Sequence, residues 1–387
     1  MKLLWLASHP IQYQAPLFRA LAARCELTVA FAHRQSAAQQ GQAGYGVAFE
    51  WDVNLLEGYR SVFLRPAARA PSIEHFWGCR SDDVAPLLEQ ERPDAVVVGG
   101  WNLYVYWQAL MAARRRDIPV LARTDSRAKP EPAWRRLARQ LAYPPMLGRF
   151  SGFLAAGTQS TQCLGGLGVP PERIFICPHT VDVARFGGGR VTAPAERAVL
   201  RARLGLRADV RIVAFVGRLI GLKRPLDACA ALARLPDSQG HEILYVGDGA
   251  LAGAIDAEAQ RLGVAARRVG FRNQHELPDW LRACDVLVLP SESETWGMVT
   301  NEALAAGCPV ILSDGAGSAV DLQRFAPAVQ VYPRGEVAAL AGCLQHAAGA
   351  DPAAVQRAIH DAVASFTPDV AAQRCLAAIA AAAGQRP

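Results

Sequence analysis

Short runs of consecutive apolar residues alternate with longer stretches of helical character along almost the whole chain. Continuous Val/Ile/Leu runs separated by helices are typical of parallel sheets that are covered on both faces. The first half is predicted to contain strands at 2–8, 27–32, 94–100, 119–124, 152–157 and 174–179. The second half repeats the scheme at 211–217, 241–247, 267–271, 285–291, 309–314 and 328–332, with helices such as 104–116 and 251–262 in between.

This pattern predicts an α/β protein made of two doubly wound domains. A Gly-rich, Pro-containing stretch at 183–195 looks like a hinge, and a helix rich in Arg and Ala follows it. A chain of 387 residues with 51% hydrophobic content is long enough for two such domains. Ligands of these sheets bind outside the carboxyl ends of the strands, so we expect functional residues directly after each strand.

Composition narrows the function classes. The formal net charge of +6 is modest for this length, and no Lys/Arg run argues for nucleic acid. The nine cysteines are an odd number without a CxxC spacing, which favours reduced, buried thiols. The first residues lack the pattern of a signal peptide, and no apolar stretch reaches about 18 residues. We therefore expect a soluble, cytoplasmic protein.

Two cations follow the first strand of the second half. Arg218 comes directly after that strand and Lys223 begins the next helix. At this spacing they can grip a diphosphate and offset the charge of a departing phosphate, although a pair of solvated basic residues would look the same. The Gly-x-Gly that begins at Gly247 after the next strand is a weak signal by itself.

Two glutamates flank a Trp-Gly turn in the stretch SESETWGMVTNEALAAG. Glu294 precedes a helix predicted from about Met298 to Ala306, and Glu302 lies inside it. A helix amino terminus attracts a diphosphate, and carboxylates accept hydrogen bonds from sugar hydroxyls. The alternative is a pair of acidic residues favoured by the helix dipole. The loop at 315–319 is a second candidate for an anion-binding nest of backbone amides.

The order of these motifs resembles a known family. G-R-L-x-x-x-K, then V-G-D-G, then P-S-x-x-E-x-x-G-x-x-x-x-E-A-x-A-x-G-x-P-V-I is similar to the donor domain of the retaining nucleotide-sugar glycosyltransferases of family 4. The resemblance implies the GT-B fold, two Rossmann-like domains that face each other across a cleft. It implies an acceptor domain at 1–185, a donor domain at 186–365 and a C-terminal helix at 366–387 that packs back on the first domain.

The resemblance also assigns roles in the donor domain. It implies that Arg218 and Lys223 stabilise the leaving diphosphate, that Glu294 binds donor-sugar hydroxyls and that Glu302 binds the ribose. The loop after 270 would read the base by its backbone. The remaining donor-binding residues implied in this way are Gly217, Gly247, Phe271, Arg272, Trp296, Gly297, Met298 and Val299. Many relatives carry a Gly-Gly pair and a Glu where this chain has DGAGSAVDL, so Asp321 is given no catalytic role.

The first domain would hold the acceptor, and its candidates also follow strands. His9 is a candidate for contact with both substrates, and Asp125 for orienting the acceptor hydroxyl. His179 stands where many relatives have Asn, and it either faces the cleft or only turns the chain. Aromatic faces suit sugar rings, although half of those near residue 101 are expected to pack helices. The other acceptor candidates are Gln12, Tyr13, Trp101 and Asn102.

The resemblance implies a front-face mechanism in which the leaving diphosphate itself takes the acceptor proton. The two-carboxylate scheme of glycosidases does not fit, because the two glutamates are assigned to hydroxyl contacts. The sequence has no D-x-D and no His/Cys ligand spacing, so we expect neither a metal nor a cofactor.

The expected activity is transfer of a hexosyl group from a nucleotide sugar, UDP-sugar favoured and GDP-sugar second, in synthesis of surface polysaccharide, lipopolysaccharide or glycolipid. Alternatives within the fold are glycosylation of a small metabolite, a nucleotide-sugar epimerase or a sugar phosphorylase. An NAD-dependent oxidoreductase would need the G-x-G-x-x-G that the first strand-helix unit lacks. A sugar-binding module without catalysis is the third class.

A basic amphipathic stretch at 132–150 has no role in these schemes. Trp134, Leu137 and Leu141 alternate there with Arg135, Arg136 and Arg139. Such a helix either lies on an anionic membrane, which would place the protein on the inner face of the membrane, or is a solvated surface helix.

Overall fold

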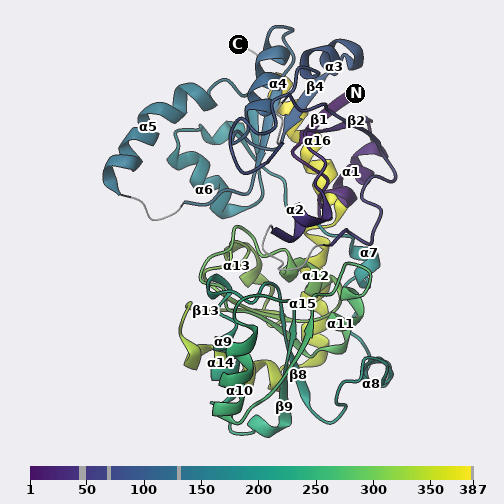
Figure 1. Cartoon of the computed structure of the whole chain (residues 1–387), viewed down its shortest axis with the longest axis vertical. Helices are drawn as coiled ribbons and strands as arrows, with labels where there is room; N and C mark the ends of the chain where they lie inside the picture. Colours follow the sequence, from purple (N-terminus) through teal and green to yellow (C-terminus); the bar gives the residue numbers. More distant parts are fainter. Residues whose placement is uncertain (43–48, 68–70, 129–131, 385–387) are drawn as a thin grey trace. The chain divides into compact units, whose positions relative to one another are not determined.

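The structure is a computed structural model that describes residues 1–42, 49–67, 71–128 and 132–384 (Figure 1). The chain divides into two compact units. Unit 1 consists of Met1–Gln35, Asn54–Thr180 and the C-terminal segment from Pro368 onward. Unit 2 consists of Ser36–Val53 and Val181–Thr367. Each unit is built around its own parallel sheet, as the alternation of strands and helices predicts.

The described sheet of unit 1 has seven parallel strands in the order β3-β2-β1-β4-β5-β6-β7. Six of them lie at predicted positions. The strand β3 has no predicted counterpart, because it is short and half-exposed at the sheet edge and so lacks a continuous apolar run. The strands are β1 (Lys2–Ala7), β2 (Glu26–Phe31), β3 (Arg60–Phe63), β4 (Ala95–Val98), β5 (Val120–Thr124), β6 (Gly152–Ala155) and β7 (Ile174–Ile176).

Helices cover both faces of this sheet, so alternate residues of one strand enter two different cores. Trp5 of β1 packs with Phe18 of α1 and Ile379 of α16. On the other face, Leu4 and Leu6 of β1 pack with α3 and α4. This explains why the strands read as unbroken apolar runs. The helices of unit 1 are α1 (Ala15–Ala22), α3 (Val84–Glu91), α4 (Tyr104–Arg114), α5 (Ala133–Leu147), α6 (Thr158–Gly166) and α16 (Pro368–Gly384).

The described sheet of unit 2 has six parallel strands in the order β10-β9-β8-β11-β12-β13, all at predicted positions. They are β8 (Arg211–Val216), β9 (His241–Val246), β10 (Ala265–Gly270), β11 (Val286–Leu289), β12 (Val310–Ser313) and β13 (Val329–Tyr332). One face is covered by α11 (Leu277–Ala283), α12 (Val299–Ala305) and α15 (Pro352–Ala364). The other is covered by α9 (Leu226–Leu232), α10 (Ala252–Leu262) and α14 (Val337–Gly349). The remaining helices are α2 (Ala37–Gln42), α7 (Val183–Phe186), α8 (Pro194–Arg203) and α13 (Ala319–Leu322).

Strand order marks one switch point in each sheet. In unit 1 the order reverses between β1 and β4, and in unit 2 between β8 and β11. Loops diverge above and below the sheet at such a point and leave a crevice at the carboxyl ends of the two strands. Ser8 and Gly99 occupy this position in unit 1, and Arg218 and Ser291 in unit 2.

The division of the chain differs from the predicted domain boundaries of 1–185, 186–365 and 366–387. Val181–Arg185 belongs to unit 2, because Val181 and Phe186 are buried in its core. The C-terminal segment that joins unit 1 starts at Pro368, and residues 385–387 of the predicted helix lie outside the described residues. The segment Ser36–Val53 also belongs to unit 2, which the strand pattern does not predict.

Within the described residues, no helix is both long and apolar enough to cross a membrane. The nine cysteines are free thiols, and seven of them are buried, as their positions in apolar runs predict.

Candidate functional site

The predicted cations and the first predicted glutamate of unit 2 meet beyond β8 and β11. Lys223 ends a short 3-10 turn after β8, and Glu294 lies in the loop after β11. The Lys223 ammonium forms an ion pair with the Glu294 carboxylate, and only 15% and 13% of the two side chains are exposed. The carboxylate also accepts a hydrogen bond from the Ser291 hydroxyl at 3.3 Å. The structure thus brings the two residues together at the switch point.

Charge at this point is dominated by cations. Burial, and secondarily the Arg218 guanidinium, lower the pKa of Lys223 to about 8. The Glu294 carboxylate opposes this effect, because an opposite charge in contact favours the charged form. We therefore take Lys223 as protonated at pH 7. Together with Arg218 it makes this corner of unit 2 suitable for an anionic group.

Gly217 and Gly247 let two post-strand segments approach closely. Both have positive φ angles, of 146° and 142°, and a Cβ on Gly247 would lie 2.0 Å from the carbonyl oxygen of Gly217. The Gly217 amide donates to the Val246 carbonyl at 2.9 Å, and the Gly247 amide to the Gly270 carbonyl at 2.8 Å. Any larger residue at 247 would push the loops after β8 and β9 apart.

Glu302 is a buried carboxylate held in a polar network. It lies in α12 with 6% of its surface exposed and accepts a hydrogen bond from the Gln274 side-chain amide at 3.3 Å. Arg185 in turn donates to the Gln274 side-chain oxygen at 2.7 Å and to its backbone carbonyl. Burial raises the pKa of Glu302, and the Gln274 amide and the Arg185 charge oppose that shift. A carboxylate in this state gains from further hydrogen-bond donors such as hydroxyls.

The loop after β10, predicted to contact the base, is covered by the segment Ser36–Val53. The rings of Phe271 and Phe49 are 4.7 Å apart at an interplanar angle of 42°. The Asn273 side-chain amide donates to the Glu50 carbonyl at 2.6 Å, and the His275 amide donates to the Asp52 carboxylate at 3.1 Å. The strand pattern does not predict that this segment belongs to unit 2.

The side chain of Arg272 in the same loop contacts other residues of unit 2. It donates to the Glu276 carboxylate at 3.2 Å and to the Val269 carbonyl at 2.9 Å. Its guanidinium also lies 5.2 Å from the Trp280 ring centre. The side chain therefore supports the loop, and a base contact from this position would come from its backbone.

The start of α12 is rigidly built. Trp296 is buried, and its indole N–H donates to the Asn301 side chain at 2.8 Å. Gly297 has a φ of 91°, a backbone conformation that favours glycine, and a Cβ there would also lie 2.8 Å from the end of the Leu289 side chain. Met298 and Val299 follow at the first helical turn, and both are partly buried.

The prediction that the backbone amides of 315–319 form an anion-binding nest is wrong for three of these amides. The backbone N–H groups of Ala316, Ser318 and Ala319 donate to the carbonyls of Ser313, Trp296 and Ala316, respectively. A Cβ on Gly315 would meet the Ser291 carbonyl oxygen at 2.3 Å. The loop therefore packs against residues 291–296, and these three N–H groups are already hydrogen-bonded within the protein.

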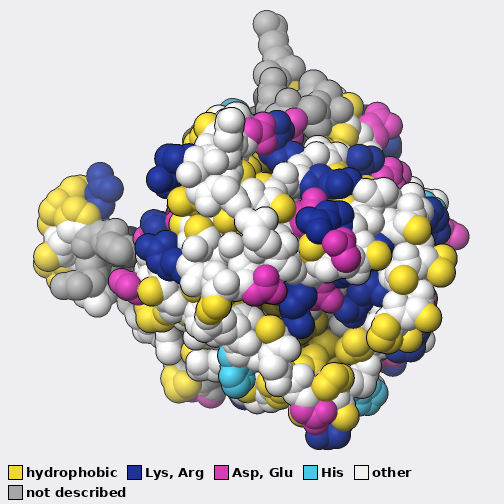
Figure 2. Space-filling view, turned by 90° about the horizontal axis from the view of Figure 1, so that it is seen from below, with side chains coloured by type: hydrophobic (Ala, Val, Ile, Leu, Met, Phe, Trp, Pro, Cys, Tyr) yellow, Lys and Arg dark blue, Asp and Glu magenta, His cyan; other side chains and the backbone are white. Residues whose placement is uncertain are grey.

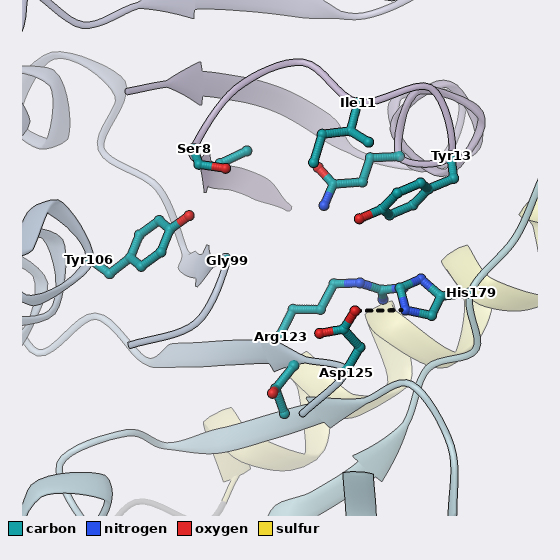
Figure 3. A pocket seen from close by; sticks show the side chains of 11 residues that line it. Ser8, Ile11, Tyr13, Gly99, Tyr106, Arg123, Asp125 and His179 are labelled. Atoms are coloured by element: carbon teal, nitrogen blue, oxygen red, sulfur yellow. Dashed lines mark ion pairs between the residues drawn. The ribbon is translucent and has the colours of Figure 1, made fainter. Parts of the chain in front are cut away.

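Unit 1 contains a pocket of about 170 Å³ at its own switch point (Figure 3). It is open at the carboxyl ends of β1, β4 and β5, and its polar side chains project inward from several elements. The Tyr106 hydroxyl and Ser8 lie on one side, and Asp125 and His179 on the other. The lining residues are Ala7, Ser8, Ile11, Tyr13, Gln14, Gly99, Tyr106, Arg123, Thr124, Asp125 and His179.

Asp125 and His179 form the polar end of this pocket. Their closest oxygen and nitrogen atoms are 3.7 Å apart, and the His179 ring packs edge-on against Tyr13 with ring centres 5.4 Å apart. Burial lowers the pKa of His179, so its imidazole is neutral at pH 7. Burial works to raise the pKa of Asp125, but hydrogen bonding and charge from His179 lower it overall. The pair is therefore a carboxylate beside a neutral imidazole, which can accept a proton or a hydrogen bond from a hydroxyl.

Other predicted acceptor residues lie outside the lining of this pocket. The His9 imidazole contacts the Ser8 hydroxyl at 3.0 Å, and Gln12 is replaced in the lining by Gln14. Trp101 packs edge-on against Phe153 of β6 with ring centres 6.0 Å apart, and its backbone carbonyl accepts a hydrogen bond from the indole N–H of Trp107 in α4 at 2.8 Å. Asn102 is exposed beside Gly100. The interpretation of Trp101 as a packing residue is therefore favoured.

The pocket also includes Tyr106 and Arg123, which are not among the predicted site residues. Tyr106 is buried in the first part of α4, and burial raises the pKa of its hydroxyl, which stays neutral. Arg123 in β5 is 6% exposed and donates to the Cys177 sulfur at 3.0 Å and to the Pro178 carbonyl at 3.3 Å. Arg123 is the second-last residue of β5, two positions before the post-strand residue Asp125, so the strand pattern points close to it. The helical position of Tyr106 carries no comparable signal.

Among the residues that the structure describes, no group of three or more His, Cys, Asp or Glu side chains is arranged to hold a metal ion. Metal independence stays a prediction.

Three comparisons with known proteins show what this chain resembles. Residues 196–341 match the family model described as glycosyl transferases group 1. A D-inositol 3-phosphate glycosyltransferase of Streptomyces bingchenggensis is 33% identical over 232 residues, which are 54% of this chain and 49% of the relative. The chain thus spans about half the length of the curated relatives it matches.

Solved structures resemble the whole chain. HepE of Anabaena, crystallised with UDP, is 19% identical with a TM-score of 0.73 over 98% of this chain and all of that one. Sucrose-phosphate synthase of Thermosynechococcus elongatus is 19% identical with a TM-score of 0.69 over 97% and 98% of the two chains. At these identities the likeness establishes the fold, which is the GT-B fold of two Rossmann-like domains.

Proposed function

We propose that this chain, which has the GT-B fold and carries a group 1 glycosyltransferase domain at residues 196–341, is a retaining glycosyltransferase. It transfers a hexosyl group from a nucleoside diphosphate sugar to a hydroxyl acceptor. The observation that carries this proposal is the cluster of Arg218, Lys223 and Glu294 at the switch point of unit 2, with the buried Glu302 in the adjoining α12.

The cations and the carboxylates of this cluster are proposed to bind different parts of the donor. Lys223 and Arg218 attract the diphosphate, and they stabilise it most when it carries the extra charge of a leaving group. Glu294 accepts hydrogen bonds from sugar hydroxyls, and Glu302 accepts them from the ribose, for which its buried carboxylate is suited. HepE was crystallised with UDP and with UDP-glucose, which supports a UDP-sugar as the donor.

The acceptor hydroxyl is proposed to bind in the pocket of unit 1. Asp125 and His179 accept a hydrogen bond from this hydroxyl. Tyr13 and Tyr106 provide ring faces and a hydroxyl that orient the acceptor. Attack occurs on the face of the sugar from which the diphosphate departs, and the diphosphate takes the acceptor proton. This course explains retention without a protein nucleophile.

Two acceptor classes are candidates for this pocket. The proposed product is a surface polysaccharide, a lipopolysaccharide or a glycolipid. The second candidate is a small polyol, because two of the relatives are named D-inositol 3-phosphate glycosyltransferases and a pocket of about 170 Å³ suits a small group.

The donor half is tested by a thermal-shift titration with UDP, GDP, ADP, NAD and their common sugar conjugates. A ligand that binds only the native state raises the melting temperature. We expect a shift with one nucleoside diphosphate, lost in Glu302→Gln and kept in Glu258→Gln, a half-buried glutamate of α10 that pairs with Arg261. A shift with NAD alone, or with none of the ligands, would contradict the proposal.

Retention is tested separately with the nucleotide sugar that gives a shift. Proton NMR of the first product, recorded before any anomeric exchange, reports the configuration at the transferred carbon. We expect the configuration of the donor; the opposite anomer would rule out the front-face course while leaving donor binding intact.

A further inference from the structure

Helix α5 (Ala133–Leu147) of unit 1 exposes an unusual amount of apolar surface. Trp134, Leu137 and Leu141 are 66%, 58% and 71% exposed. Of the twelve large apolar side chains that the described residues expose most, four lie on this one helix, with Met146 as the fourth. Figure 2 shows the protruding lobe on the left with its hydrophobic side chains grouped beneath a basic one. We call Trp134, Leu137 and Leu141 the α5 face.

The residues of the α5 face are spaced to lie together. Positions separated by three and by seven fall on one side of an α-helix, so the three side chains form a continuous stripe. The helix is anchored at its far end, where Leu147 and Phe150 are buried in the core of unit 1. The first turns therefore project from the unit with their apolar side chains uncovered within the described part of the chain.

The same helix is purely basic. Ala133–Leu147 contains three arginines and no Asp or Glu. The Arg135 guanidinium lies 5.1 Å from the centre of the Trp134 ring, and that of Arg139 lies 5.1 Å from the Tyr143 ring. The arginines of α5 therefore lie along the edge of the apolar stripe. An apolar face with a basic border complements a surface that is apolar inside and anionic outside.

We propose that the α5 face is a docking surface for an anionic lipid bilayer. The helix lies in the plane of the interface, with Trp134, Leu137 and Leu141 at the boundary of the acyl chains. Arg135 and Arg139 contact the lipid phosphates. With 15 residues and three arginines, α5 is too short and too polar to span the bilayer. This inference does not depend on the proposed function.

A second copy of the chain is a poorer occupant. A twofold contact places the same surface of both copies together, so the arginines of one α5 would face those of the other. The helix offers no carboxylate to offset them. Anionic lipid supplies both the missing negative charge and the apolar layer.

Cosedimentation of the full chain with sucrose-loaded vesicles tests the proposal. One vesicle type contains phosphatidylcholine alone, and the other contains phosphatidylcholine and phosphatidylglycerol in equal parts. We expect strong binding to the anionic vesicles and weak binding to the neutral ones, with a marked decrease at high salt. The fold of each variant is checked by its melting temperature.

Two variants and their controls separate the apolar and charge contributions. Trp134→Ser/Leu137→Ser/Leu141→Ser removes the stripe, and its control is Trp77→Ser, a tryptophan that is 60% exposed elsewhere on unit 1. Arg135→Gln/Arg139→Gln removes two cations, and we expect a loss of roughly 30-fold in the partition coefficient for lipid-bound arginines. Its control is Arg115→Gln/Arg357→Gln, which changes two exposed arginines outside α5.

Binding that both α5 variants lose and both controls keep would support the proposal. Equal binding to neutral and anionic vesicles, or unchanged binding of the triple variant, would overturn it. So would a concentration-dependent dimer in analytical ultracentrifugation that the triple variant abolishes, because the face would then be an interface between two copies.

Discussion

The side chain of Lys223 forms an ion pair with that of Glu294, although α9, β9, α10, β10, α11 and β11 lie between them in the chain. The pair forms because β8 and β11 are neighbours in the sheet and their loops leave the same edge. A cation held against a carboxylate at a switch point has a fixed position before any ligand arrives. Such preorganisation is what a transition state with developing charge requires.

Replacing Lys223 should therefore affect turnover more than folding. We expect Lys223→Ala to lower kcat by about 100-fold or more, since removal of one preorganised charge donor has effects of this size. Donor binding should weaken less, because Arg218 remains. The measurement is steady-state kinetics with varied donor. Lys2→Ala, a change at an exposed lysine of unit 1, is the control, and wild-type turnover in Lys223→Ala would refute the leaving-group role.

Asp125 gives a prediction for the other substrate. Asp125→Asn keeps the size of the side chain but removes the charge that faces His179. We expect a raised KM for the acceptor and a lower kcat, with the thermal shift by the nucleotide unchanged. Asp82→Asn, at an exposed position of the same unit, is the matched change. A loss of nucleotide binding in Asp125→Asn would show that the unit 1 pocket serves the donor instead.

The segment Ser36–Val53 should stabilise the loop after β10. Phe49 is 9% exposed and packs on Phe271, so Phe49→Ala removes most of that contact. We expect a loss of about 3 kcal/mol in the free energy of unfolding of unit 2 and faster amide hydrogen exchange at 271–275. Phe76→Ala, a phenylalanine that is 38% exposed in unit 1, is the control. Unchanged exchange at 271–275 would mean that the segment does not hold this loop.

Continuous apolar runs predicted twelve of the thirteen described strands, because burial on both faces leaves a strong local signal. The edge strand β3, whose sequence is RSVF, lacks that signal because its side chains stay half-exposed. Post-strand positions also predicted Lys223 and Glu294, since parallel strands bring their carboxyl ends to one edge.

Contacts between segments that are distant in the chain could not be predicted from local sequence patterns. Nothing in the local pattern around Phe49 shows that it packs on Phe271, because an aromatic residue in a short loop segment has many possible partners. Tyr106 was missed for a similar reason, since its place in α4 resembles that of any buried helix residue. Gln12 was named in place of Gln14, because adjacent loop residues cannot be distinguished without the backbone.

His9 should make the protein less stable in acid. Burial, and secondarily the charge of His33, lower the pKa of His9 to about 4, whereas an unfolded histidine titrates near 6.5. Between these values the unfolded chain binds more protons, so the free energy of unfolding falls as the pH drops from about 6.5 toward 4. At pH 5 the loss from His9 alone is about 2 kcal/mol. Burial lowers the pKa of His179 as well and adds a loss of the same sign.

Urea unfolding at pH 7 and pH 5 measures this effect. His9→Gln keeps a polar side chain but cannot be protonated, so its stability should fall less than that of the wild type between the two pH values. His360→Gln changes an exposed histidine of unit 2 and should leave the wild-type pH dependence in place. If His9→Gln and the wild type lose the same free energy on acidification, then His9 titrates normally in the folded protein and is open to solvent.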